Sequence, residues 1–369
     1  GEVDMRALLF LLFILFISES YGKDLDYRDI QAAIDGLSAS GGGTLRLRPG
    51  VYEVAGGLQL KSNVRLVGSG VDITVLRLTG SKRAHVVRAV DARNIGIEDL
   101  TVDGNWSNAG GGEGIRLDHV TNVTIRNVEI RNTRDYGIGM QWGAIRRVRI
   151  DRVRLENIGT DGIDIKNRGE GNSDIFISDV TVSSFDQRKV GGKAAIDVRG
   201  PVYLSNITVS GVTGRSDGIR FHRTDESNMS GQGSSLYDFH VAGDGQNKAS
   251  GVRIRASNVW VSNGSISRVE YGVEIDSITL LEGVTVSGIT VENSQMAFRN
   301  THGDRPFFSD CSALDSLYGF YLKRKAAILE SMVARGTYGI NLEPGATRTR
   351  LVANHLQETQ YPFISKSVQ

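Results

Sequence analysis

The sequence predicts an all-β solenoid, in which one chain winds into about eleven coils of short parallel strands behind an N-terminal capping helix. A unit of 20–33 residues recurs along most of the chain, and each unit begins with Gly or Ala followed by alternating apolar and polar residues. Alternation with a period of two is typical of a strand with one buried face. No amphipathic helix separates these strands, so the parallel pairing has to come from coiling and not from helical crossovers.

Two strand signatures make up the repeating unit. The second of them places Asn or Asp between two pairs of apolar residues, and we expect these side chains at the corners of the coils because they bond nearby backbone. They are Asn127, Asp179, Asn206 and Asn263. The first signature starts with Gly or Ala and has apolar residues at its second and fourth positions. It occurs at 114–117, 137–140, 162–165, 195–198, 218–221, 251–254, 272–275, 319–322 and 339–342.

A short helix is predicted at residues 27–38. Ile30, Ala33, Ile34 and Leu37 lie there at helical spacing. A glycine-rich stretch follows, in which the apolar period changes to two. Because an open stack of coils exposes its core, we expect this helix to cover the first coil.

Residues 5–22 have the features of a secretory signal peptide. They contain one arginine, an apolar run at 7–17 and small residues around an expected cleavage site at 18–20. The run is too short to span a bilayer, which disfavours a membrane anchor. We therefore expect a signal peptide at 1–22 and a parallel β-helix domain at 23–369. The protein is expected to be secreted or periplasmic, without a membrane partner once the signal is removed.

The charge balance and the cysteine count exclude other classes of protein. Removing residues 1–20 takes one arginine from 43 Lys and Arg and three acids from 42 Asp and Glu, which leaves 42 against 39. That excess is too small to indicate a nucleic-acid partner. Cys311 is the only cysteine, which excludes an internal disulfide and a cysteine-based metal site. The sequence does not indicate an oligomeric state.

The opening of the domain carries a family resemblance. The motif spread over 29–35, 41–45 and 49–52 resembles the start of the pectate-lyase-like right-handed parallel β-helix superfamily, and the coils are similar to its pectate lyase and polygalacturonase branches. The resemblance implies a right-handed coil and a polysaccharide-active protein. It does not imply one reaction, since the superfamily includes lyases, hydrolases, epimerases and phage depolymerases.

The chain departs from these relatives where the chemistry would be decided. Residues 159–166 resemble the polygalacturonase segment that carries an aspartate doublet, with Thr160 in place of one aspartate. Residues 218–222 resemble its substrate clamp, with Arg220 retained and His222 in place of a lysine. That family's Gly-His-Gly is missing. The resemblance therefore implies a fold and a location for the site.

A second partial match lies one coil earlier. Residues 136–141 resemble the catalytic strand of alginate epimerases, with Tyr136 retained. Gly139 and Gln141 stand where that motif has aspartate and histidine. This strand is therefore expected to border the site without supplying the whole of an epimerase centre.

A polar wall is predicted on the outer face of five neighbouring strands. Neighbouring coils lie about 4.8 Å apart, so Asp164, Lys166, Asp197, Arg199, Arg220 and His222 should fall within roughly 15 Å of one another. Asp161 and Asp217 precede two of the strands, although Asp-Gly is also a turn signal. An ordinary solvated face is the alternative interpretation. The outward residues are Asp164, Lys166, Asp197, Arg199, Arg220, His222, Arg253 and Arg255.

Two features favour a functional site on this wall. Extra residues bracket the charged strands, and function concentrates on loops held by a rigid scaffold. Like charges on neighbouring strands destabilise a sheet unless a ligand relieves the repulsion. Arginine forks match carboxylates, so the expected partner is an acidic polysaccharide containing uronic acids. The extra residues lie at 167–173, 184–193, 223–235 and 242–250.

Hydrolysis and elimination make opposite demands on these residues. Glycoside hydrolysis needs two carboxyl groups, one of them protonated. Asp164 and Asp197 meet the distance requirement, but the surrounding cations are expected to hold both ionised. β-Elimination needs cations that neutralise a uronate carboxylate, plus a base and a proton donor. His222 fits either proton-transfer role because histidine titrates near neutral pH, and Lys166 and Tyr136 are alternatives.

We therefore predict an enzyme that acts on an acidic polysaccharide, as a lyase or a related epimerase. A glycoside hydrolase and a non-catalytic polysaccharide-binding β-helix stay open as alternatives. No cofactor is predicted; the alternative is a Ca²⁺ bridge through Asp161, Asp164 or Asp197, which the arginines would crowd. The predicted catalytic residues are Lys166, Asp197, Arg220 and His222. The predicted substrate-binding residues are Tyr136, Gln141, Asp161, Asp164, Arg199, Asp217, Arg253 and Arg255.

Overall fold

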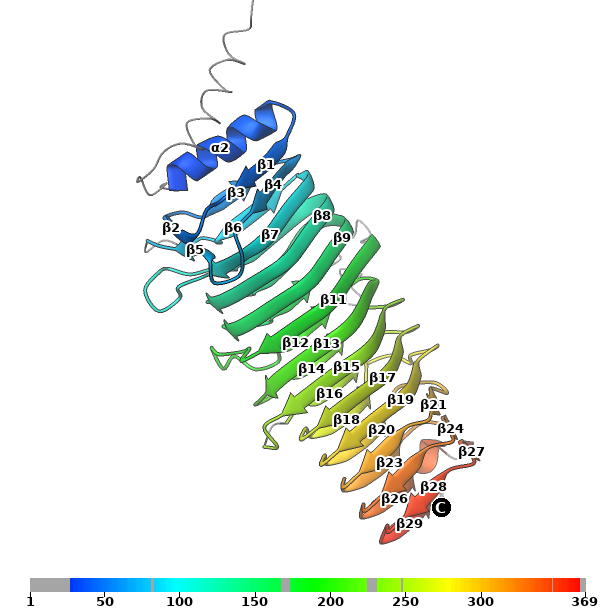
Figure 1. Ribbon diagram of the computed structural model, residues 1–369. Helices are drawn as coiled ribbons and strands as arrows, with labels where there is room; N and C mark the ends of the chain where they lie inside the picture. The colour runs from blue at the N-terminus through cyan, green and yellow to red at the C-terminus, as the bar shows by residue number, and fades with distance from the viewer. Residues whose placement is uncertain are drawn as a thin grey trace, which may run out of the picture.

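The protein is a parallel β-solenoid of about 12 turns with one short helix at its N-terminal end. A computed structural model describes residues 27–80, 83–166, 173–223, 231–246, 248–346 and 348–365. The coils stack into an elongated rod that runs from the helix to the C-terminus (Figure 1). The all-β parallel solenoid predicted from the repeats is confirmed. The predicted signal peptide at 1–22 lies outside the described residues.

Helix α2 (Tyr27–Ala39) covers the N-terminal end of the rod, as predicted. Ile30 and Ile34 are fully buried, and Leu37 packs partly against the core. Gln31 ties the helix to the first coil: its side chain accepts from the Gln59 backbone N–H at 2.8 Å and donates to the Gln59 carbonyl at 3.0 Å. The helix therefore covers the apolar core at the open end and also forms hydrogen bonds with the backbone of the first coil.

One ladder of parallel strands, here called ladder A, carries the predicted polar wall. Its register pairs Ile163 with Ile196 and Ile196 with Ile219, so equivalent residues of successive coils lie side by side. Its strands are β3 (Leu58–Leu60), β6 (Val87–Val90), β8 (Ile115–Thr133), β9 (Ile138–Ile158), β10 (Ile163–Ile165), β12 (Ala194–Val198), β14 (Asp217–Phe221), β16 (Ser250–Ile254), β18 (Tyr271–Ile275), β20 (Met296–Asn300), β23 (Tyr318–Leu322), β26 (Tyr338–Leu342) and β29 (Tyr361–Ser365).

Two further ladders, B and C, complete each coil. Ladder B begins with β1 (Gly43–Arg46) and β4 (Val64–Val67), ladder C with β2 (Gly50–Val54) and β5 (Thr74–Leu78). In the middle of the rod, single bent strands serve both ladders: β7 (Arg93–Asp103), β8, β9, β11 (Ser173–Ser183), β13 (Val202–Val212), β15 (Ser235–Gly243), β17 (Trp260–Ser267) and β19 (Thr285–Glu292). At the C-terminal end the ladders separate again, into β21 (Phe307–Ser309), β24 (Ala327–Leu329) and β27 (Arg350–Val352) for ladder B, and β22 (Ser312–Leu314), β25 (Met332–Ala334) and β28 (His355–Gln357) for ladder C.

The corners between ladders B and C are held by the predicted Asn and Asp residues. Asn127, Asp179, Asn206 and Asn263 all have positive φ, between 50° and 54°. Asn and Asp tolerate this left-handed conformation better than most residues. Three of these side chains also bond from coil to coil: Asn127 donates to Asp99 at 2.7 Å, and Asn206 donates to Asp179. The corners therefore form a second stack beside the strands.

The interior of the solenoid is a continuous apolar stack. Every residue predicted to point inward from the middle of ladder A is completely buried. Ring stacking takes over at the C-terminal end, where Phe298 and Phe320 lie parallel with centroids 4.7 Å apart. No helix within the described residues is long and apolar enough to cross a membrane. The confirmed inward residues are Ile163, Ile165, Ile196, Val198, Ile219 and Phe221.

Candidate functional site

The outward side chains of ladder A form two columns. In the first, here called the inner column, Asp164, Asp197, Arg220 and Arg253 are direct partners on successive strands. The second, called the outer column, comes from the residues two positions further along. The outer column consists of Lys166, Arg199, His222 and Arg255. Their backbone N–H groups continue the ladder by donating to the carbonyl groups of Met140, Ile165, Val198 and Phe221, in that order. The alignment predicted from the repeats is confirmed.

The inner column is a buried network of ion pairs, which differs from the ordinary solvated face that was the alternative interpretation and from the exposed substrate clamp expected at Arg220. Arg220 is only 7% exposed. Its guanidinium donates to both carboxylate oxygens of Asp197, at 3.0 Å each, and to the Gly192 carbonyl at 3.0 Å. Asp217 and Asp161 lie 3.5 and 3.9 Å from it. Arg220 is therefore committed to protein carboxylates and is not an exposed clamp.

The network shifts the pKa values of two of its acids in opposite directions. Burial alone would raise the pKa of Asp197, but Arg220 and Arg199 outweigh it and lower that pKa to about 2. Burial raises the pKa of Asp161 to about 7, and the charges of Asp164 and Asp197 add to the rise. Asp197 is therefore ionised at neutral pH, as expected from the sequence, while Asp161 is poised to titrate there.

Asp161 and Asp217 have a structural role at the start of their strands. Asp161 accepts the backbone N–H of Ala194 at 2.8 Å, and Asp217 accepts that of Ser250 at 3.1 Å. Each carboxylate thus fixes the beginning of the next coil, 33 residues further on. Both are buried, so the structure places them below the surface of the predicted site.

Arg199 is the cation of the outer column whose guanidinium is anchored to carboxylates through one terminal nitrogen only. Its Nη1 lies 2.7 Å from Asp164 Oδ1 and 2.8 Å from Asp197 Oδ2. Its Nη2 has no hydrogen-bond partner among the residues described. Lys166 and His222 flank it on the two adjacent strands, each about 4.8 Å away along the ladder. The structure therefore brings these three predicted site residues together.

His222 is held in one tautomer. Its Nδ1 lies 3.0 Å from the Arg223 carbonyl, which only accepts, so Nδ1 carries the hydrogen and Nε2 the lone pair. Burial lowers the pKa of His222, and the positive charge of Arg199 lowers it further. The imidazole is therefore neutral at neutral pH, with Nε2 able to accept a proton.

Lys166 lies in a cluster with Gln141, Asp164 and Tyr136. Its Nζ donates to Gln141 Oε1 at 2.7 Å and lies 3.2 Å from Asp164 Oδ2. It also lies over the Tyr136 ring, 5.3 Å from the centroid. Burial raises the pKa of Tyr136, and the charges of Asp164 and Asp161 raise it further. The phenol therefore keeps its proton.

Glu113 is a site residue that the sequence analysis missed. Burial raises its pKa to about 7, against the lowering effect of Arg116, whose Nη1 donates to Oε1 at 2.7 Å. Its Oε2 is buried without a partner in the part of the chain described. That oxygen occupies the space a side chain at Gly139 would need. The signal was present in the sequence, since Glu113 precedes a Gly-Ile step as Asp161 and Asp217 do.

Arg253 and Arg255 are paired one coil further on. Arg253 binds Asp276 through two hydrogen bonds of 2.9 and 2.7 Å and lies 3.4 Å from Glu274. Arg255 lies 3.3 Å from Asp276. Both predicted binding residues therefore continue the site along ladder A, with their charges largely balanced. Within the described ranges, no group of three or more His, Cys, Asp or Glu side chains is arranged to hold a metal ion.

The sequence matches one protein family and is partly similar to polysaccharide-active proteins. The profile of a family described as rhamnogalacturonase A/epimerase, pectate lyase-like, matches residues 22–231. An alginate lyase of Azotobacter vinelandii, alginate lyase 7, is 35% identical over 168 residues, which span 40% of this chain and 20% of that protein. The mannuronan C5-epimerase AlgE2 of the same organism is 36% identical over 166 residues, spanning 38% and 16%. The matched stretch is thus at most about a fifth of these two relatives.

The solved structures show a similar fold. The A-module of the mannuronan C5-epimerase AlgE6 of Azotobacter vinelandii superposes with a TM-score of 0.60 and 20% sequence identity. The superposition covers 92% of this chain and 95% of the module. At this identity the likeness shows a shared parallel β-helix architecture.

Proposed function

The chain belongs to the rhamnogalacturonase A/epimerase, pectate lyase-like family, and on that premise we propose that it is an exported enzyme acting on an acidic, uronate-containing polysaccharide. We propose that it works as a lyase by β-elimination or as the related epimerase. Partial similarity to an alginate lyase and to mannuronan C5-epimerases supports this substrate class. The arrangement of Lys166, Arg199 and His222 on three successive strands is the observation that carries the proposal.

Both reactions begin by removing the proton on the carbon next to the uronate carboxylate. That proton becomes removable when cations neutralise the carboxylate, because the negative charge that develops is then stabilised. Arg199 is held by two buried carboxylates through Nη1, which leaves Nη2 without a hydrogen bond to the described residues. We assign it to hold the uronate carboxylate. Lys166, one strand away, adds a second positive charge.

His222 is the proposed base. Its Nε2 has the lone pair and its neutral form prevails at neutral pH, so it can take the proton without first losing one. On the other side of Arg199, the Lys166 ammonium and the Tyr136 phenol both hold a proton. In elimination one of them protonates the departing glycosidic oxygen as the carbon–oxygen bond breaks. In epimerisation it returns a proton to the opposite face of the same carbon.

The inner column is proposed to act through Arg199 and not on the substrate. Asp164 and Asp197 fix the Arg199 guanidinium in place. Arg220, on the neighbouring strand, balances the charge of Asp197. Asp197 and Arg220, which the sequence favoured as catalytic, are therefore proposed as positioning residues. A preorganised cation needs no rearrangement when charge develops in the transition state.

The test is product analysis with two polyuronates, alginate and polygalacturonate. New ultraviolet absorbance together with new reducing ends identifies a lyase. A change in sugar configuration by NMR, without chain cleavage, identifies an epimerase. Binding without any product identifies a non-catalytic polysaccharide-binding protein and contradicts the proposal, as does the absence of both binding and product.

One observation favours a glycoside hydrolase as a second candidate. Asp161, with a pKa raised to about 7, lies in the same network as Asp197, with a pKa lowered to about 2. Two carboxyl groups whose proton affinities are pushed apart are typical of an acid and a base in glycoside hydrolysis. New reducing ends without ultraviolet absorbance would support this candidate over elimination.

A further inference from the structure

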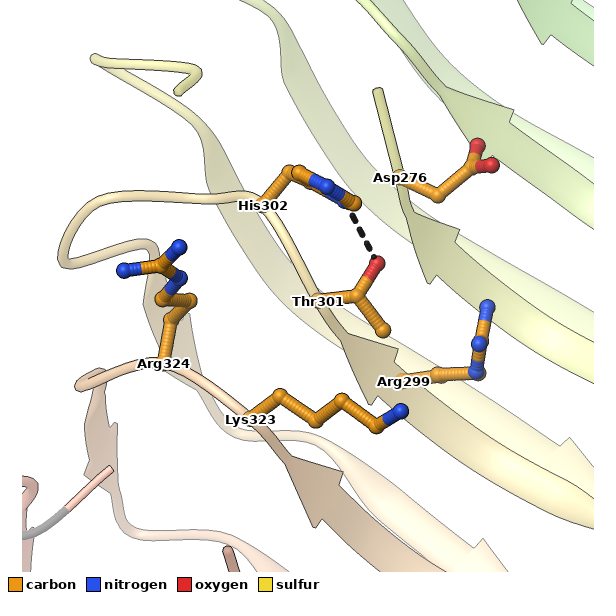
Figure 2. A pocket seen from close by; sticks show the side chains of 6 residues that line it. All are labelled: Asp276, Arg299, Thr301, His302, Lys323 and Arg324. Carbon is orange, nitrogen blue, oxygen red and sulfur yellow. Dashed lines mark hydrogen bonds between the residues drawn. The ribbon is translucent and has the colours of Figure 1, made fainter. Parts of the chain in front are cut away.

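A separate pocket lies further along ladder A, toward the C-terminus. It has a volume of about 390 Å³ and is lined by Asp276, Arg299, Thr301, His302, Lys323 and Arg324. Figure 2 shows Arg299 and Lys323 extending toward the same side of Thr301, while Arg324 lies on the far side of His302. Nitrogen-bearing side chains from two successive coils therefore border the opening, and the coil before them contributes Asp276.

The pocket has an excess of unpaired positive charge. Arg299 is paired with Glu274, and Asp276 is taken up by Arg253 and Arg255. In the part of the chain that is described, no carboxylate lies within ion-pair distance of Lys323 or of the Arg324 guanidinium. Lys323 instead lies over the Tyr321 ring, 6.0 Å from its centroid. Since most cations nearer the centre of the ladder have an acidic partner, these two stand out.

His302 lines the pocket beside Thr301. Thr301 Oγ1 lies 3.2 Å from the Ile275 carbonyl and 2.9 Å from His302 Nδ1. These contacts hold the imidazole at the pocket, on the coil that carries Arg299 and on its Asp276 side (Figure 2). The pocket thus has the chemistry of an anion site: three cationic side chains line it, and its one acid, Asp276, is already paired.

The pocket is aligned with the proposed centre. The outer column that contains Arg199 and His222 continues through Asp276 and Thr301 to Lys323, as the backbone hydrogen bonds show. Five strand spacings separate Arg199 from Lys323, a distance of roughly 24 Å. A polymer that follows the ladder would therefore reach the pocket several sugars beyond the reacting one.

We propose that this pocket is a distal subsite that binds a carboxylate of the same acidic polysaccharide, with Lys323 and Arg324 as its main contacts. This inference rests on the proposed substrate class. Because the subsite is remote from the proton transfer, it increases affinity for long chains and leaves the chemical step unchanged. A chain too short to bridge the two places gains nothing from it.

The experiment uses the double variant Lys323→Gln/Arg324→Gln. Its matched control is Arg335→Gln/Arg350→Gln, which removes two positive charges from exposed positions on ladders B and C. Binding of oligomannuronates and oligogalacturonates, of two and of about ten sugars, is measured by calorimetry, and turnover by product formation. Neutral mannan oligosaccharides of the same lengths serve as uncharged probes.

For the long uronates we expect the pocket variant to bind about tenfold more weakly and to show KM raised about tenfold with kcat unchanged. The short uronates and the control variant should be unaffected. Equal affinity of wild type and pocket variant for long uronates overturns the subsite, even if turnover is observed. Turnover failing in the wild type, while long uronates still bind through Lys323 and Arg324, overturns the proposed reaction and keeps the subsite. Absence of uronate binding in the wild type overturns both.

Discussion

Arg220 and Asp197 lie opposite each other on neighbouring strands of ladder A and join through two parallel hydrogen bonds of 3.0 Å. Both side chains are buried. A bidentate pair of this kind is geometrically specific. Because the pair is poorly hydrated, removing either partner strongly destabilises the fold. The pair therefore fixes the platform on which Arg199 rests.

The first prediction is that Arg220→Ala destabilises the protein by about 3–5 kcal/mol, because it removes the bidentate partner of the buried Asp197 carboxylate and leaves Arg199 as its one ion-pair partner among the described residues. Urea unfolding followed by circular dichroism measures the change. The double variant Asp197→Asn/Arg220→Met, which removes both charges, should recover much of the loss. Equal losses in the single and double variants would contradict a coupled pair.

The second prediction concerns the core. Ile196 is completely buried between Ile163 and Ile219 in the stack. Ile196→Asp places an unpaired charge there and should prevent folding, seen as insoluble expression or loss of the β-sheet circular dichroism signal. Ile196→Val removes one methylene group and should cost only about 0.5–1.5 kcal/mol. A soluble, folded Ile196→Asp protein would contradict the inward orientation.

The fold was predictable from the sequence because a solenoid repeats one local pattern many times. The alternation that placed Ile163, Ile196 and Ile219 inside is a property of single strands, and stacking only multiplies it. The site was less predictable. The pattern put Asp197 and Arg220 on the outer face correctly, but whether an outer face is solvated depends on which side chains meet across coils. That information is not local, so the burial of Arg220 was missed.

The third prediction is that Glu113 makes stability depend on pH. Its pKa in the folded protein is about 7, above the ordinary value of 4.5. The folded state therefore binds the proton more tightly, and stability falls as pH rises from 4.5 to 7. Glu113→Gln should remove this slope and gain up to about 3 kcal/mol relative to wild type at alkaline pH. Urea unfolding at several pH values measures it, and a pH-independent difference would contradict the shift.

The fourth prediction tests the contact between Gly139 and Glu113. A methyl group at Gly139 would overlap the Glu113 carboxylate and approach Gln141. Gly139→Ala should therefore cost about 1–3 kcal/mol, as overpacking of a buried site does. Combining it with Glu113→Ala, which frees the space, should cost less than the sum of the two single variants. Additive costs in unfolding measurements would show that the two positions do not compete for space.

The last prediction concerns proton transfer. His222→Gln removes the proposed base and should lower product formation on a polyuronate by at least about a hundredfold while the protein stays folded. Lowering of the His222 pKa below 6.5 places the acidic limb of the wild-type kcat/KM profile below that pH, because the base is lost as pH falls through its pKa. The residual activity of the variant should lack this limb.

Its matched control is His240→Gln, which changes an exposed histidine on another ladder that bonds only Ser265 among the described residues. This variant should keep full activity. Arg199→Gln should raise KM and lower kcat together, since Arg199 is proposed to hold the carboxylate in both the ground state and the transition state. Full activity in both His222→Gln and Arg199→Gln, on a substrate that the wild type converts, would place the reaction elsewhere on the solenoid. Loss of activity in His222→Gln with an unchanged acidic limb would leave His222 a structural role and assign the limb to another group.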